Sequence, residues 1–355
     1  MTRKSEPPFI FNINTMNQTP RECQTAGIDV SSKTLDVFLM DKEEKGKYKR
    51  FQNNKKGIRE LIEYFRKNNL DGKIVMESTG RYHELVAVTL FAESFDVYVI
   101  NPLHAKKYHT SQIRKLKTDK NDAKILAEMA LKDKKLNKFT LTKSDMHIKR
   151  KIGFVRSLEK KIQELNGVLR NFKAGQQDLG GEIAIHEENI QTLVKNIEKE
   201  KKYIEADIIE KVFQSDAPEA IEAKRILESI SGISLYYAAI IYFYYSKTLG
   251  KKAKSWIAYT GLEVSIKESG QSKGKGKLSK RGNKYLRKKS FNAGWGAYMH
   301  NPAFKEYYSR LKEMGRSHVE ALVIIGRKVL RIAFYCLKNN QLFNPDILMN
   351  QMTEK

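Results

Sequence analysis

Residues 25–40 read TAGIDVSSKTLDVFLM, and this stretch decides how the opening part of the chain folds. AGIDVSS is a short β-type run, and TLDVFLM alternates well enough to form a second strand, with Lys33 and Thr34 at the turn between them. The KYKRFQN stretch that follows reads as a third strand. We therefore expect an antiparallel meander of three strands at the start of the folded chain.

Helix and strand patterns alternate after this meander. GIRELIEYFRKN spaces its apolar residues as an amphipathic helix, and KIVMEST, HELVAVTLFAE, DVYVINP and NDAKILAEMAL then read as strand, helix, strand and helix. Three hairpin strands followed by this alternation predict a mixed sheet with helices packed on it.

The second half of the chain has a helical texture. Apolar residues recur at three- and four-residue steps on both sides of the polar break GQQDLGG, which predicts an antiparallel helical hairpin that forms a coiled coil within the chain or with a partner. Beyond it the pattern is mainly helical, with basic, glycine-rich loops. We thus divide the chain into a mobile arm (1–22), an α/β domain (23–145), a coiled-coil hairpin (146–215), a mainly helical C-terminal domain (216–345) and a tail (346–355).

The charge balance points to a polyanionic partner. The 355 residues hold 66 Lys+Arg against 41 Asp+Glu, a net charge of +25. Such an excess is unusual for an enzyme of small neutral metabolites and is typical of proteins that bind nucleic acid. No apolar run is long enough to cross a bilayer, and two cysteines cannot form a disulfide framework. We expect a cytoplasmic protein that binds nucleic acid and no membrane.

Four acidic residues stand out by their positions. Asp29 lies on the first strand and Glu77 ends a later one, and Asp119 and Asp122 share one face of a helix start. Brought together, four carboxylates would repel one another unless cations neutralised them. All-oxygen ligands suit Mg²⁺ or Mn²⁺, which assist phosphodiester chemistry in pairs. The alternative is that each acid is an ordinary cap or strand end.

Two basic segments accompany these acids. The first leads into the aspartate pair, and the second, from Gln271 to Lys289, holds nine basic residues and no acidic one. Ser269 precedes the second segment, where cations could lower the pKa of its hydroxyl, although Ser265, Ser272 and Ser279 have similar surroundings. The SISGIS turn around Gly232 resembles a helix-hairpin-helix, whose turn amides can hold a phosphate. The candidate nucleic-acid contacts are Lys106, Lys107, Arg114, Lys115, Lys117, Lys273, Lys275, Lys277, Lys280, Arg281, Asn283 and Arg287.

The sequence resembles the DEDD transposases of the one-ten insertion-sequence family, which includes the Piv-type DNA invertases. The stretches that carry this resemblance are GIDVSSKTLDVFL, VMESTGRYHELV, KTDKNDAKILAEMA and ESGQSKGKGKLSKRGNKYLRK. The resemblance covers about residues 25–335. It implies a RuvC/RNase H-like N-terminal domain whose metal-binding tetrad is Asp29, Glu77, Asp119 and Asp122, and a C-terminal domain whose nucleophile is Ser269. Family members commonly have a proline after the glycine-leucine pair, whereas this chain reads Gly261-Leu262-Glu263-Val264, so Ser265 and Ser272 stay open as alternative nucleophiles.

The resemblance also implies a reaction and partners. Family members cut and rejoin DNA through a covalent phosphoserine link, with Mg²⁺ on the tetrad, and a structured non-coding bridge RNA pairs with donor and target DNA. They act as dimers or tetramers on DNA. Two other hypotheses stay open, and the resemblance favours them less. One is a junction-resolving nuclease in which metal-activated water attacks, and the other is a non-enzymatic nucleic-acid scaffold.

Overall fold

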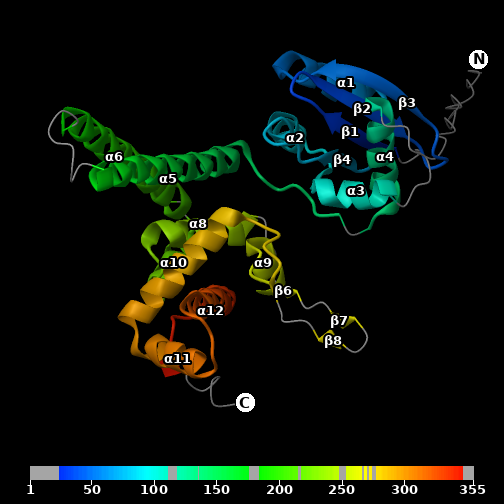
Figure 1. Cartoon of the computed structure of the whole chain (residues 1–355). Coiled ribbons are helices and arrows are strands. Elements are labelled where there is room, and N and C mark those ends of the chain that lie inside the picture. The colour runs from blue at the N-terminus through cyan, green and yellow to red at the C-terminus, as the bar shows by residue number, and fades with distance from the viewer. Residues whose placement is uncertain are drawn as a thin grey trace, which may run out of the picture. The chain divides into compact units, whose positions relative to one another are not determined.

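The structure, a computed structural model, describes residues 24–110, 118–134, 136–175, 184–214, 217–247, 253–265, 268–269, 272–273 and 277–346. The predicted N-terminal arm, and the C-terminal tail beyond residue 346, lie outside these ranges. The chain forms two compact units, Met1–Thr142 and Lys143–Lys355, and Figure 1 shows the elements of each.

A five-stranded mixed sheet forms the centre of the first unit. The meander is β1 (Thr25–Val30), β2 (Thr34–Met40) and β3 (Gly46–Gln52), and β4 (Ile74–Glu77) and β5 (Val97–Ile100) complete the sheet in the order β3-β2-β1-β4-β5. Neighbours within the meander are antiparallel, whereas β1 with β4 and β4 with β5 are parallel. The predicted mixed sheet is confirmed.

Four helices accompany the sheet: α1 (Lys55–Lys67), α2 (His83–Ala92), α3 (Pro102–Thr110) and α4 (Asp119–Lys132). The α3 helix is an addition to the elements that the sequence predicted. Helix α4 packs over β1, β2 and β4, and the four apolar side chains Phe38, Met40, Ala123 and Ala127 form one of its contacts with the sheet. Burial of this apolar surface fixes α4 on one face of the sheet.

The second unit is helical. Two long helices, α5 (Lys143–Gly175) and α6 (Ala184–Phe213), form a hairpin, and α5 ends where the predicted polar break begins. The helices α7 (Pro218–Glu228), α8 (Leu235–Lys247), α9 (Ala253–Thr260), α10 (Lys284–His300), α11 (Pro302–Glu313) and α12 (His318–Asn339) follow. Between α9 and α10 the chain forms two short ladders, β6 (Val264–Ser265) with β9 (Lys277–Leu278) and β7 (Glu268–Ser269) with β8 (Ser272–Lys273).

The base of the hairpin is part of the same hydrophobic core as the later helices. Ile152 and Val155 of α5, Ile208 of α6 and Ile240 of α8 are buried together in one cluster. Phe172 and Leu193, which belong to the same apolar stripes, are largely exposed. The apolar stripes are therefore buried as a packing seam at the base of the hairpin, and they are only partly buried farther along it.

None of the helices among the described ranges combines the length and the apolar character needed to cross a bilayer.

Candidate active site

Cross-strand pairing sets a row of charged residues on one face of the sheet. Arg50 lies opposite Asp36 in the β2–β3 pair, and Asp36 lies opposite Asp29 in the β1–β2 pair. Because Ile28 pairs with Met76, the next residues, Asp29 and Glu77, stand at the same level on adjacent strands. Side chains at matching positions of paired strands share a face, so the register gathers these four side chains on one side.

This is the face that α4 covers, and Gly27 allows the helix to approach closely. A Cβ at Gly27 would lie 2.0 Å from the Ala123 carbonyl oxygen and 2.3 Å from the Ala127 nitrogen. Asp29 follows two residues later and points to the same face. The missing side chain thus brings the start of α4 to the row of acids on the sheet.

The two aspartates of the KTDKNDA stretch lie in the first turn of α4, as predicted. Thr118 caps the helix by accepting a hydrogen bond from the Asn121 amide at 3.3 Å. Carboxylates in a first helical turn are favoured by the helix dipole. The cap and the dipole therefore explain locally why Asp119 and Asp122 begin a helix at this position.

The acids act on one another electrostatically. Burial, followed by the negative charges of Asp122, Asp119, Asp36 and Glu77 in that order, raises the pKa of Asp29 to about 6. Repulsion of this kind requires that the charges be near each other in a medium that screens them poorly. The predicted tetrad residues are thus brought into one electrostatic group, together with Asp36.

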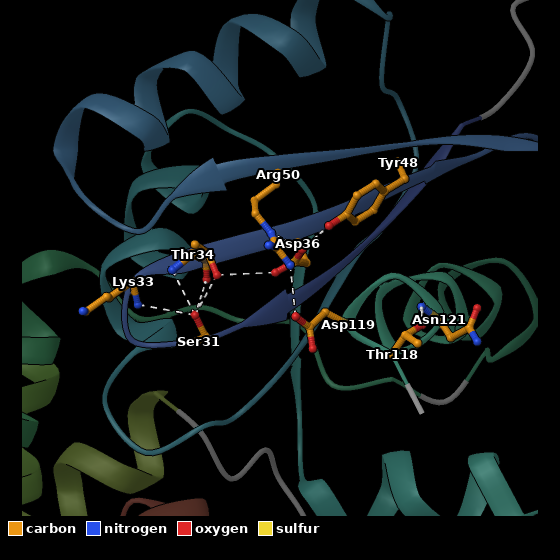
Figure 2. A network of polar contacts seen from close by, with 9 residues as sticks. All are labelled: Ser31, Lys33, Thr34, Asp36, Tyr48, Arg50, Thr118, Asp119 and Asn121. Carbon is orange, nitrogen blue, oxygen red and sulfur yellow. Dashed lines mark hydrogen bonds and ion pairs between the residues drawn. The ribbon is translucent and has the colours of Figure 1, made fainter. Parts of the chain in front are cut away.

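Asp36 and Arg50 are the functional candidates that the sequence analysis missed. The Asp36 carboxylate is buried, with 2% of its side chain exposed. Figure 2 shows it accepting hydrogen bonds from the Tyr48 hydroxyl and from Arg50 Nε, the latter at 2.8 Å, while Arg50 Nη2 donates to Asp119 Oδ2 at 3.0 Å. A polar residue in the middle of the apolar TLDVFLM strand was the available signal for Asp36, and the hairpin register was needed to place it beside Asp29.

A divalent ion fits the chemistry of this group. The donors are carboxylates, which Mg²⁺ and Mn²⁺ prefer, and a cation would relieve the repulsion that raises the pKa of Asp29. Within the described ranges, no three acidic, histidine or cysteine side chains are already gathered as an ion-binding set.

The basic segment before α4 is described only in part. Lys106 is exposed on α3. Lys107 lies on the same helix, but its side chain is outside the described set, and Arg114, Lys115 and Lys117 lie in the undescribed segment 111–117. Their contacts with nucleic acid therefore stay a prediction.

The predicted serine loop contains the two short ladders between α9 and α10. The backbone of Ser269 lies on β7, where it pairs with Ser272 on β8, and Ser265 lies on β6. The leading serine and one alternative are thus neighbours across one ladder. Lys273 and Lys277 lie on β8 and β9, and Lys275 falls outside the described residues.

Hydrogen bonds close the base of this loop. Arg287 Nη1 donates to the carbonyls of Thr260 at 3.0 Å and Lys280 at 3.3 Å, and the Asn283 side chain caps α10 by accepting from the Tyr285 and Leu286 amides. Arg287 and Asn283, predicted as nucleic-acid contacts, thus have a structural role here. Lys280 and Arg281 are exposed at the same end of the loop.

An ion-pair cluster ties α10, which follows the loop, to α5. The Glu159 carboxylate of α5, 12% exposed, lies 3.1 Å from Lys288 Nζ and 2.7 Å from Lys289 Nζ. The Tyr285 hydroxyl also donates to Glu159 at 3.0 Å. Three contacts on one buried carboxylate therefore fix the first turns of α10 against the hairpin.

The turn around Gly232 packs closely against α10. Gly232 has a φ of 89°, and a Cβ there would lie 2.2 Å from the Ala293 carbonyl oxygen. A residue without a side chain is required by this approach and by the positive φ. The helix-hairpin-helix resemblance of this turn therefore has a packing explanation, and phosphate binding by its amides stays a prediction.

Two family models match the chain in order. A model of DEDD transposases of the IS110 type, described as "Transposase", matches residues 26–171, and one described as "Transposase IS116/IS110/IS902 family" matches residues 224–309. The "Pilin gene-inverting protein" of Moraxella bovis is 25% identical over 90% of this chain and 98% of its own length, and that of Moraxella lacunata is 26% identical over the same shares.

Two solved structures are also similar to part of the chain. Thermus thermophilus RuvC bound to a Holliday junction substrate has 11% identity and a TM-score of 0.27, and RuvC alone has 13% identity and a TM-score of 0.25. Each comparison covers 33% of this chain and 99% of the other.

The matches of the two family models follow each other along the chain, and the curated relatives match over almost their entire length. The chain therefore belongs to the IS110 family of transposases.

Proposed function

We propose that this protein is a recombinase that cuts and rejoins DNA strands, with Asp29, Glu77, Asp119 and Asp122 as its ion-binding carboxylates and Ser269 as its nucleophile. The observation that carries the proposal is the electrostatic group around Asp29, whose pKa is raised first by burial and then by Asp122, Asp119, Asp36 and Glu77. Structural caps and strand ends would not need to be crowded on one face of a sheet.

The carboxylates would hold Mg²⁺ or Mn²⁺, which supplies charge stabilisation at a phosphate undergoing displacement. The serine hydroxyl loses its proton as its oxygen forms a bond to phosphorus, and the bond from phosphorus to one sugar oxygen breaks. That sugar oxygen takes up a proton, and the chain stays joined to DNA as a phosphoserine ester. Rejoining reverses these bond changes with the sugar hydroxyl of another strand.

The DNA partners follow from charge as well as from family membership. The net charge of +25 favours polyanions, and Lys280 and Arg281 present exposed cations at the base of the loop that carries Ser269. The names of the Moraxella relatives support inversion as one form of the reaction. A bridge RNA that pairs with donor and target DNA, and a dimer or tetramer on DNA, are part of the proposal through the resemblance to the family.

Single-residue variants test the reaction. We expect Ser269→Ala and Asp29→Asn each to abolish recombination of a substrate with the native flanking DNA, since one removes the attacking oxygen and the other a ligand. The parental protein should leave a protein–DNA adduct on a denaturing gel, and Ser269→Ala should not. Ser279→Ala removes a loop hydroxyl outside the proposed site and serves as the control.

The outcomes separate the alternatives. If Ser269→Ala recombined DNA at the parental rate and Ser272→Ala or Ser265→Ala lost recombination, the nucleophile would be Ser272 or Ser265 instead. Nicked products with free ends and no adduct would indicate a nuclease that uses water. If all tetrad variants retained strand transfer, the carboxylates would be structural. RNA that co-purifies with the protein from cells carrying its native flanking DNA, once sequenced, tests the bridge RNA.

A further inference from the structure

Asp36 is a fifth carboxylate beside the proposed tetrad. It stands directly opposite Asp29 across the β1–β2 pair and is almost completely buried. A buried carboxylate is costly unless hydrogen bonds or a counter-charge compensate it. Tyr48 and Arg50 donate to its Oδ1, and the Thr34 hydroxyl lies 3.5 Å from its Oδ2. Its oxygens are therefore occupied by contacts within the sheet.

Arg50 uses two different nitrogens for two carboxylates. Nε faces buried Asp36 on β2, and Nη2 faces Asp119 at the start of α4 (Figure 2). A guanidinium is a rigid planar fork, so the position of one arm fixes the position of the other. Asp36 thus aims the arm that holds Asp119 at its Oδ2.

The charges of the group agree with this division of roles. The five acids Asp29, Asp36, Glu77, Asp119 and Asp122 carry five negative charges when ionised. Arg50 supplies one positive charge that Asp36 and Asp119 share. Asp36, the more deeply buried of these two carboxylates, is thereby compensated within the sheet.

We propose that Arg50 is a positioning residue for Asp119: held by Asp36, it fixes the Asp119 carboxylate so that this group enters a divalent-ion site already oriented. The inference rests on the proposed function, which makes Asp119 a ligand. Ligating carboxylates are commonly oriented by hydrogen bonds from residues that do not themselves touch the ion.

A purely structural ion pair does not account for this arrangement. The side chains of Arg50 and Asp119 are 51% and 64% exposed, and ion pairs at such exposure contribute little to folding stability. Without Arg50, the exposed Asp119 carboxylate would lose a contact that orients it. The contact of Arg50 with Asp119 is therefore expected to act in ion binding, whereas its contact with buried Asp36 contributes to stability.

Isothermal titration calorimetry of the full-length protein with Mn²⁺, in the absence of DNA, tests the inference. We expect Arg50→Gln to bind Mn²⁺ about 10- to 100-fold more weakly than the parent. Arg50→Lys should also bind more weakly, because one ammonium cannot reach both carboxylates with the geometry of the fork. The control is Lys47→Gln, which removes one positive charge from the same strand on the opposite face and should bind as the parent does.

A double variant shows whether Asp36 acts through Arg50. Asp36→Asn should weaken Mn²⁺ binding in the same direction, and the double variant Asp36→Asn/Arg50→Gln should be no weaker than Arg50→Gln alone, because the two residues act as one unit. Circular dichroism checks that each variant is folded. If Arg50→Gln does not fold, Arg50→Lys carries the test.

Each result has a definite meaning. Parental or tighter Mn²⁺ binding by folded Arg50→Gln or Arg50→Lys overturns the positioning role, and tighter binding would make Arg50 a competitor of the ion. Asp29→Asn reports on the proposed function separately. If it binds Mn²⁺ as well as the parent, the carboxylate site fails and the inference falls with it. If only Asp29→Asn binds weakly, the site stands and the positioning role fails.

Discussion

At the scale of the residue, the carboxyl group of Asp29 shows how the candidate site affects the stability of the first unit. Burial, followed by the charges of Asp122, Asp119, Asp36 and Glu77, raises its pKa to about 6. Because the folded-state pKa lies above the ordinary value, the proton favours the folded state. This contribution is fully present below about pH 4 and is lost as the pH rises through 6.

We therefore expect Asp29→Asn to stabilise the ion-free protein above pH 6, since an amide carries no charge to repel the other acids. The gain should be about 1 kcal/mol, less than the full shift implies, because the group is partly exposed and screened. Melting temperatures in EDTA between pH 4 and 8 measure it. Glu60→Gln, an exposed change on α1, should show no such trend, and a variant less stable than the parent at pH 8 would contradict the prediction.

Single residues differ in how far the sequence could predict them. Asp29, Glu77, Asp119 and Asp122 stand at strand positions and a helix start that periodicity identifies, and their roles rest on the family resemblance. Asp36 and Arg50 become neighbours of this group only through cross-strand register. Register is a property of paired strands and not of either strand alone, which is why the sequence did not disclose them.

At the scale of the element, the link between α5 and α10 depends on one carboxylate. Burial by itself would raise the pKa of Glu159, but its contacts with Lys289 and Lys288 outweigh burial and lower the pKa below the ordinary value. A lowered pKa means that the ionised form stabilises the fold. This stabilisation is present above the ordinary value of 4.5 and is lost as the pH falls through the lowered pKa.

We expect Glu159→Gln to reduce the free energy of unfolding by about 2 kcal/mol at pH 7, because half-buried Lys289 loses its counter-charge. The difference from the parent should shrink in acid. Urea unfolding at pH 7 and pH 4 measures both effects. Glu164→Gln is a matched control on the same helix, since Glu164 also pairs with two lysines but is solvent-exposed. Equal losses in the two variants would show that the buried cluster has no special role.

The elements were largely predictable where hydrophobic periodicity was strong. The five strands of the sheet and the helices α1, α2 and α4 lie where the patterns predicted them. The α3 helix was not predicted, because PLHAKKYHT is short and polar and shows little apolar periodicity. The short ladders within the basic loop were also missed, since two-residue strands leave no alternation to detect.

At the scale of the whole molecule, net charge governs the encounter with DNA. A charge of +25 predicts binding that weakens steeply with salt, because each phosphate that a cation neutralises releases a counterion. Family membership and a mixed sheet could be predicted from the sequence. The role of the basic segment 111–117 stays a prediction, since a charge run carries no fold information.

Exposed Arg281 should contribute to this dependence. We expect Arg281→Gln to reduce the slope of log affinity against log salt by about 1, measured by fluorescence anisotropy on a DNA duplex. Arg66→Gln is the control, because Arg66 is already neutralised by Glu93 at 2.5 Å and should leave the slope unchanged. Identical slopes for parent and Arg281→Gln would exclude Arg281 from the DNA contact.

Arg287 joins the two ends of the serine loop by donating to the carbonyls of Thr260 and Lys280. The loop therefore leaves and re-enters the helical core at one fixed point. We therefore expect that the length and composition of this segment can change without disturbing α9 or α10. Exchanging it between related transposases should transfer properties of the loop while leaving the scaffold intact.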